Sequence, residues 1–80
     1  MITVRYFAAA RAAAGVSEEQ VPAGGTLDEI TAALVARRGE RLGTVLAAAS
    51  FLVDGVACRD RERRLPDVAV IDVLPPFAGG

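Results

Sequence analysis

Hydrophobic and polar residues alternate along both ends of the chain. The two faces of residues 2–7 hold Ile2, Val4 and Tyr6 on one side and Thr3, Arg5 and Phe7 on the other. Residues 68–74 alternate in the same way, with Ala69, Ile71 and Val73 on one face and Val68, Val70, Asp72 and Leu74 on the other. A period of two residues is typical of a strand with one buried face. The pattern therefore predicts a first and a last β-strand.

Between these strands, residues 26–38 carry the main helical pattern. Thr26 and Glu29 have the spacing of a capping box, in which each side chain bonds the other residue's backbone N–H. Leu27, Ile30 and Leu34 recur at helical spacing and predict a buried stripe that ends before Gly39. Two weaker helical patterns cover residues 8–14, which stop at Gly15, and residues 40–49.

The remaining apolar runs predict short strands. Residues 17–21 form one candidate, and residues 51–53 and 56–58 form a hairpin around Asp54-Gly55, a dipeptide favoured by type I′ turns. The order is strand, helix, strand, helix and three strands. This order predicts an α+β fold, in which a mixed sheet has one main helix packed on one face.

Composition narrows the classes of function. The chain has 80 residues, enough for one small domain, and its net charge of -1 gives no basic surface for nucleic acid. With one cysteine, Cys58, and no histidine, neither a disulfide framework nor a metal site is expected. The N-terminus begins directly in a strand pattern, so we expect neither a leader nor a membrane span. A reducing cytoplasm suits this composition best.

Two further features have ordinary structural interpretations. Residues 59–64 read R-D-R-E-R-R, and such a mixed run is more often a solvated loop than a recognition patch. Cys58 could carry sulfur, but no histidine is present to activate it, and a thiol in a strand is usually a small buried apolar group.

All nine basic residues are Arg, so the chain has no lysine to accept an isopeptide bond.

The chain ends Leu74-Pro75-Pro76-Phe77-Ala78-Gly79-Gly80, and this tail carries the candidate chemistry. We divide the chain into a domain of residues 1–74 and an extended tail of residues 75–80. The two prolines fix φ and favour a stiff arm, and the two glycines lack Cβ atoms. Such an end could thread a narrow channel and present its carboxylate for activation. The alternative is an ordinary frayed terminus.

Motifs at both ends of the chain resemble those of one known family. The opening, Met1 to Gly15, is similar to a family pattern of an apolar strand, Phe-Ala, an Arg three residues later and a Gly four residues after that. The ending resembles the family's apolar-Pro-Pro-apolar-x-Gly-Gly tail. The family is that of the ubiquitin-like sulfur carriers, which includes the small subunit of molybdopterin synthase. The resemblance implies a ubiquitin-like β-grasp fold throughout the 80 residues.

Two positions depart from the family pattern. The acidic residue that commonly follows the family arginine is Ala12 here. The usual Asp-Gly-Asp-Glu turn before the last strand is replaced by Asp67-Val68-Ala69-Val70. These departures bear on the subfamily more than on the fold.

The resemblance also implies a mechanism and a set of partners. An E1-like adenylyltransferase would use ATP and Mg²⁺ to adenylate Gly80, a sulfur-donating enzyme would supply the sulfur, and the resulting thiocarboxylate would serve a pterin precursor. The acceptor site would belong to a large synthase subunit, with which the chain would form a heterotetramer. The chain itself would bind no cofactor and no metal, and would not be an enzyme alone.

In this scheme the residues that would contact partners lie in and beside the tail. They are Phe7, Leu74, Pro75, Pro76, Phe77, Ala78 and Gly79. Phe7 and Leu74 lie on otherwise polar strand faces, which suggests a docking patch; the alternative is that both close the edge of the core. The resemblance implies that the first and last strands are neighbours, so that the two residues would form one patch next to the tail. Donation of sulfur to thiazole, cysteine or tRNA synthesis would leave a similar signature. A protein modifier and a plain interaction module are the alternatives from other classes.

Overall fold

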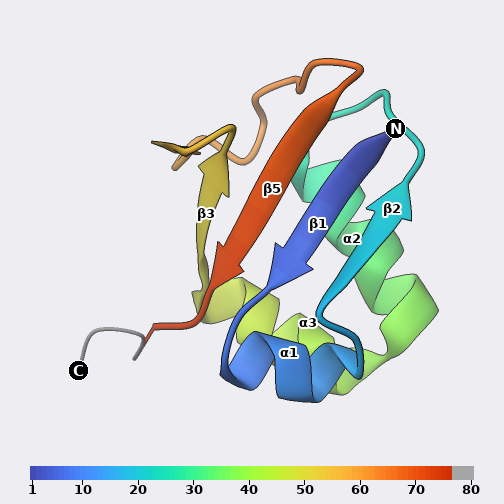
Figure 1. Ribbon diagram of the computed structural model, residues 1–80, viewed down its shortest axis with the longest axis vertical. Coiled ribbons are helices and arrows are strands. Elements are labelled where there is room, and N and C mark those ends of the chain that lie inside the picture. The colour runs from blue at the N-terminus through green and yellow to red at the C-terminus, as the bar shows by residue number, and fades with distance from the viewer. Residues whose placement is uncertain (77–80) are drawn as a thin grey trace.

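The computed structural model describes residues 1–76 and contains a five-stranded sheet with three helices (Figure 1). The elements in chain order are β1 (Ile2–Tyr6), α1 (Ala9–Ala14), β2 (Glu18–Val21), α2 (Leu27–Arg38), α3 (Glu40–Ala48), β3 (Ser50–Val53), β4 (Val56–Ala57) and β5 (Ala69–Leu74). The fold class predicted from the sequence is confirmed.

The first and last strands lie side by side at the centre of the sheet. The strand order is β2-β1-β5-β3-β4, and β1 pairs with β5 in parallel, with Ile2 opposite Ala69 and Tyr6 opposite Val73. The other neighbouring strands pair antiparallel. A mixed sheet whose two chain ends form a parallel central pair is the arrangement expected of a β-grasp fold.

Helices α2 and α3 cover one face of this sheet, whereas α1 lies at the end where β1 stops (Figure 1). The core lies between the sheet and the helices. The predicted inward residues of β1 and β5 are all buried, with at most 4% of each residue's surface exposed. Their opposite faces carry the more polar residues, so the two alternating patterns of the sequence are confirmed. We call the sheet face away from the helices the outer face.

Helix α2 begins as its sequence predicts. The Thr26 hydroxyl accepts a hydrogen bond from the Glu29 N–H at 3.1 Å, and the Glu29 carboxylate accepts one from the Thr26 N–H at 3.0 Å. Leu27, Ile30 and Leu34 are buried. The capping box satisfies two N–H groups that the first helical turn leaves unpaired, and the stripe fixes which side of the helix meets the sheet.

The pattern in residues 40–49 is a regular helix, α3, which adds an element to the order expected from the sequence. Its Gly43 faces Val35 of α2 so closely that an added Cβ would lie 3.3 Å from the valine methyls. The two helices therefore pack closely at this point. A glycine inside a helix costs stability in isolation, which explains why the helical pattern is weak in the sequence.

The hairpin turn has the predicted conformation. Asp54 and Gly55 have φ values of 50° and 82°, which are the two positive values that a type I′ turn requires. The Asp54 side chain also accepts a hydrogen bond from the Val70 N–H at 2.9 Å. The turn is thereby tied to the beginning of β5.

Candidate functional site

Phe7 and Leu74 lie beside each other where the two central strands end. The parallel register that pairs Tyr6 with Val73 places Phe7 opposite Leu74, and the Phe7 N–H donates to the Val73 carbonyl at 3.3 Å. Phe7 is 41% exposed and Leu74 is half-buried. An exposed aromatic ring next to the root of the tail has the geometry of a docking patch. That it binds a partner remains a prediction.

The tail begins directly from this patch. Strand β5 ends at Leu74, and the next residue, Pro75, is buried whereas Pro76 is exposed. The first proline therefore packs on the domain, and the second lies exposed at its surface. The predicted site residues Phe77, Ala78, Gly79 and Gly80 lie outside the described residues.

An ion pair joins the two central strands on the outer face, next to the patch. Arg5 donates from Nε to Asp72 Oδ1 at 2.6 Å and from Nη2 to Asp72 Oδ2 at 2.9 Å. The Asp72 side chain is 11% exposed and that of Arg5 is 49% exposed. The hydrogen bond and the charge of Asp72 raise the pKa of Arg5 above its ordinary value. The pair holds its two charges in fixed positions beside Phe7 and Leu74.

The sequence placed Arg5 and Asp72 on polar strand faces but did not pair them. Their partnership depends on the parallel register, which no local pattern specifies. Leu52 was also not predicted as part of this surface. It lies opposite Asp72 on the neighbouring strand β3, is half-buried and alternates with the buried Phe51 and Val53. The signal available in the sequence was the alternation of Leu52 with Phe51 and Val53, which predicts that Leu52 faces away from the core.

Cys58 lies directly after β4, is buried, and its thiol lies 3.5 Å from the Asp60 carbonyl, which accepts its weak hydrogen bond. This placement agrees with a packing role rather than with a sulfur-carrying one. Among residues 1–76, no group of three or more cysteine and carboxylate side chains could hold a metal ion.

The charged run in residues 59–64 is only partly a solvated loop. Five of its six residues are exposed, whereas Arg61 is half-buried and turns inward. The Arg61 Nη2 donates to the carbonyls of Leu46 at 3.0 Å and Ala49 at 3.3 Å, at the C-terminal end of α3. Its guanidinium also lies 4.8 Å from the centre of the Phe51 ring. The run therefore contains a residue that joins the loop to the helix and the sheet.

No helix in the described part of the chain has the length and apolar character needed to span a bilayer.

Comparisons with known proteins agree with this fold over nearly the whole chain. A putative molybdopterin converting factor subunit 1 from Pyrococcus furiosus is 27% identical, with a TM-score of 0.79, covering 94% of this chain and 95% of that one. The small archaeal modifier protein 1 (SAMP1) from Methanosarcina acetivorans is 26% identical, with a TM-score of 0.80, covering 99% and 95%. SAMP1 from Haloferax volcanii, at 20% identity and a TM-score of 0.77, covers 99% and 98% and shows the fold alone.

No curated protein sequence gives a significant match to the chain. The ThiS family model, in contrast, matches residues 4–80, which include the last three residues of β1 and the glycine tail. The chain therefore belongs to the ThiS family and has the ubiquitin-like fold of its sulfur carriers.

Proposed function

We propose that this protein carries sulfur as a thiocarboxylate on Gly80 and donates it to a pterin precursor in molybdopterin synthesis. The observation that carries the proposal is the position of the tail root. The central strand β5 delivers the tail beside the exposed Phe7, within a family whose model extends through Gly80. The relative named as a molybdopterin converting factor subunit supports the pterin recipient.

The chemistry begins with a carboxylate that is unreactive toward nucleophiles because resonance and negative charge protect its carbon. An E1-like adenylyltransferase, using ATP and Mg²⁺, joins this carboxylate to AMP and releases pyrophosphate. Hydrosulfide (HS⁻) supplied by a sulfur-donating enzyme then adds at the acyl carbon, and AMP leaves, so that a carbon–sulfur bond replaces the carbon–oxygen bond to AMP. The thiocarboxylate formed is ionised at neutral pH and is itself a nucleophile, as a thiolate is.

In this proposal the domain of residues 1–74 binds the partner proteins, and residues 75–80 extend into the partner's active site. Phe7 and Leu74 contact the partner at the tail root, Pro75 and Pro76 set the direction of the tail, and Phe77, Ala78 and Gly79 occupy the partner's channel. The acceptor site belongs to a large synthase subunit, with which the chain assembles as a heterotetramer. The cytoplasm supplies the ATP and the reduced sulfur.

Reconstitution with the activating enzyme, ATP, Mg²⁺ and a sulfur donor tests the proposal. Intact-mass analysis should show the protein heavier by the exchange of one oxygen for one sulfur. A variant with one alanine added after Gly80 should fold normally, because the addition lies beyond the domain of residues 1–74. It should receive no sulfur, because the terminal carboxyl is displaced and the Cα next to it carries a methyl group. Equal sulfur loading of this variant would refute the role of Gly80.

Protein modification is the second candidate, because SAMP1 of Methanosarcina acetivorans resembles this chain as closely as the converting factor does. A modifier would join its terminal carboxyl to lysines of other proteins. Immunoblots of the native host would then show conjugates of higher mass that persist under reducing and denaturing conditions. A pure carrier would show only the free chain.

A further inference from the structure

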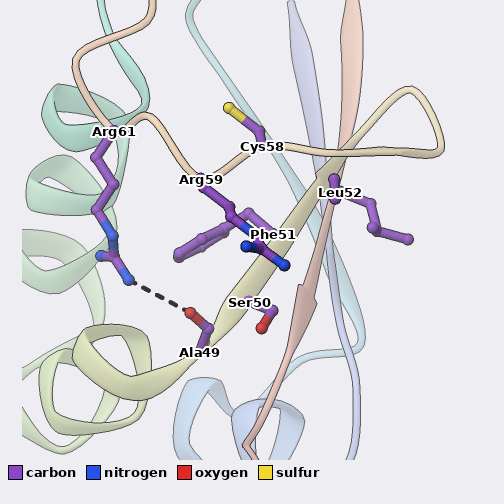
Figure 2. Close-up of a pocket in the computed structure, with 8 residues that line it drawn as sticks. Ala49, Ser50, Phe51, Leu52, Cys58, Arg59 and Arg61 are labelled. Atoms are coloured by element: carbon purple, nitrogen blue, oxygen red, sulfur yellow. Dashed lines mark hydrogen bonds between the residues drawn. The ribbon is translucent and has the colours of Figure 1, made fainter.

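A pocket of about 410 Å³ lies beside β3, where the chain leaves the short strand β4 (Figure 2). The residues that line it come from the end of α3, from β3 and from the segment after β4: Ala49, Ser50, Phe51, Leu52, Ala57, Cys58, Arg59 and Arg61. The wall contains two guanidinium groups and no carboxylate side chain.

The two arginines of the pocket differ in how they are held. Arg61 is fixed by the carbonyls of Leu46 and Ala49 and by the Phe51 ring. Arg59 is exposed and forms no ion pair with another residue of the described chain. Figure 2 shows its side chain extending over the hollow, toward the side occupied by Ser50. Arg59 is thus a cation available to a group from outside.

The pocket adjoins the root of the tail. Ser50, in the pocket wall, pairs with Leu74, the last residue of β5. Leu52, also in the wall, pairs with Asp72 and belongs to the outer face that includes Phe7. A tail of six residues spans at most about 20 Å when fully extended, so a protein that encloses its end must lie close to this root. The pocket then falls within the area that such a protein covers.

We infer that Arg59 and its pocket form a second contact for the activating enzyme and receive a carboxylate side chain, Asp or Glu, from that enzyme's surface. This inference rests on the proposed function. The two arginines give the pocket a positive charge, which favours an acidic group. The pocket also lies next to the patch of Phe7 and Leu74, because Ser50 in its wall pairs with Leu74. The activating enzyme is the occupant because every proposed fate of the tail begins with adenylation.

The test measures adenylation by the activating enzyme of the same organism, as carrier-dependent exchange of pyrophosphate into ATP, at several salt concentrations. For Arg59→Gln we expect KM to rise about fivefold with kcat unchanged, because a partly exposed charge contact contributes to binding and not to the chemical step. The rise of KM with salt should also become shallower in this variant. Arg59→Lys, which keeps the charge, should retain most of the salt dependence.

Arg63→Gln is the matched control, because Arg63 is an exposed arginine of the same loop that does not line the pocket. If Arg59→Gln and Arg63→Gln have the same KM and the same salt dependence, the inference is wrong although the carrier function stands. If the wild-type protein is not adenylated at all, the proposed function itself fails, and the inference fails with it. Thermal melts should show that both variants remain as stable as the wild type.

Discussion

Glu19 offers the sharpest test of how the sheet and α2 are held together. Its carboxylate accepts hydrogen bonds from the Tyr6 hydroxyl at 2.6 Å, from Arg37 Nη1 at 2.8 Å, and from Arg38 Nε and Nη2 at 3.1 and 3.0 Å. The Glu19 side chain is 7% exposed, and those of Arg37 and Arg38 are 47% and 26% exposed. One buried carboxylate therefore joins β2 to β1 and to the end of the main helix.

The pKa of Glu19 measures how strongly this cluster favours the charged form. Burial alone would raise the pKa, but the hydrogen bonds from Arg38, Tyr6 and Arg37 outweigh it and lower the pKa from 4.5 to about 2. A shift of this size corresponds to about 3 kcal/mol between the protonation states. Because the arginines are partly solvated, we expect Glu19→Gln to lower the free energy of unfolding by about 2 kcal/mol at pH 7.

The pH dependence follows from the direction of the shift. A carboxylate whose pKa is lower in the folded state stabilises the fold fully above its unfolded pKa of 4.5, and this contribution is lost as the pH falls through about 2. The difference in stability between the wild type and Glu19→Gln should therefore be constant from pH 7 to about pH 5 and shrink between pH 5 and pH 2. Urea denaturation followed by circular dichroism at each pH measures it.

Glu18→Gln is the control, because Glu18 is exposed on the same strand and accepts no side-chain hydrogen bond from the described residues. We expect this variant to change the free energy of unfolding by less than about 0.5 kcal/mol. The reasoning would be refuted if Glu19→Gln were no less stable than Glu18→Gln at pH 7. A difference that stayed constant down to pH 2 would also refute it.

Two further predictions concern the segment that leads away from β1. Phe7→Ala should raise KM for adenylation about tenfold and lower the free energy of unfolding by less than about 1 kcal/mol, because Phe7 is 41% exposed. Val68→Ala is the control, because Val68 is 78% exposed just before β5, and it should change neither KM nor stability. Equal KM values for the two variants would show that Phe7 does not bind the activating enzyme. Ala8 has φ 49° and ψ −122°, at the first central position of a turn closed by the Ala10 N–H and the Phe7 carbonyl at 3.0 Å, where glycine is favoured. Ala8→Gly should therefore raise the free energy of unfolding by about 0.5–1 kcal/mol in urea denaturation, and a decrease would show that Ala8 is not strained.

Local patterns in this chain were sufficient wherever neighbouring residues determine the structure. The capping box at Thr26, the Asp54-Gly55 turn and the alternation in residues 2–7 depend on contacts within a few residues, and the structure confirms them. Helix α3 was underestimated because Gly43 weakens its local preference for a helix. Its place is determined by close packing against Val35, which the sequence does not display.

Contacts between distant residues were the part that sequence reasoning missed. Arg5 and Asp72 are separated by 67 positions, and their pairing follows from the parallel register of β1 and β5. Arg61 was assigned to a solvated loop, because a run of mixed charge has no periodicity to mark one member as inward-facing. The proposed docking residues Phe7 and Leu74 were identifiable because each breaks a polar strand face. The family resemblance implied that their strands are neighbours, and the pairing of β1 with β5 confirms this.

The fold by itself is common to two chemical outcomes, since a converting factor subunit and a protein modifier resemble this chain equally well. In the proposed mechanism both outcomes would start from the same acyl-adenylate and diverge only at the nucleophile, which is sulfur for a carrier and a lysine amine for a modifier. The surface proposed to meet the activating enzyme would therefore serve either outcome. Losses at Arg59 and Phe7 should lower thiocarboxylate formation and any conjugation in equal proportion. A variant that lowered one product and spared the other would instead mark a residue that contacts the acceptor.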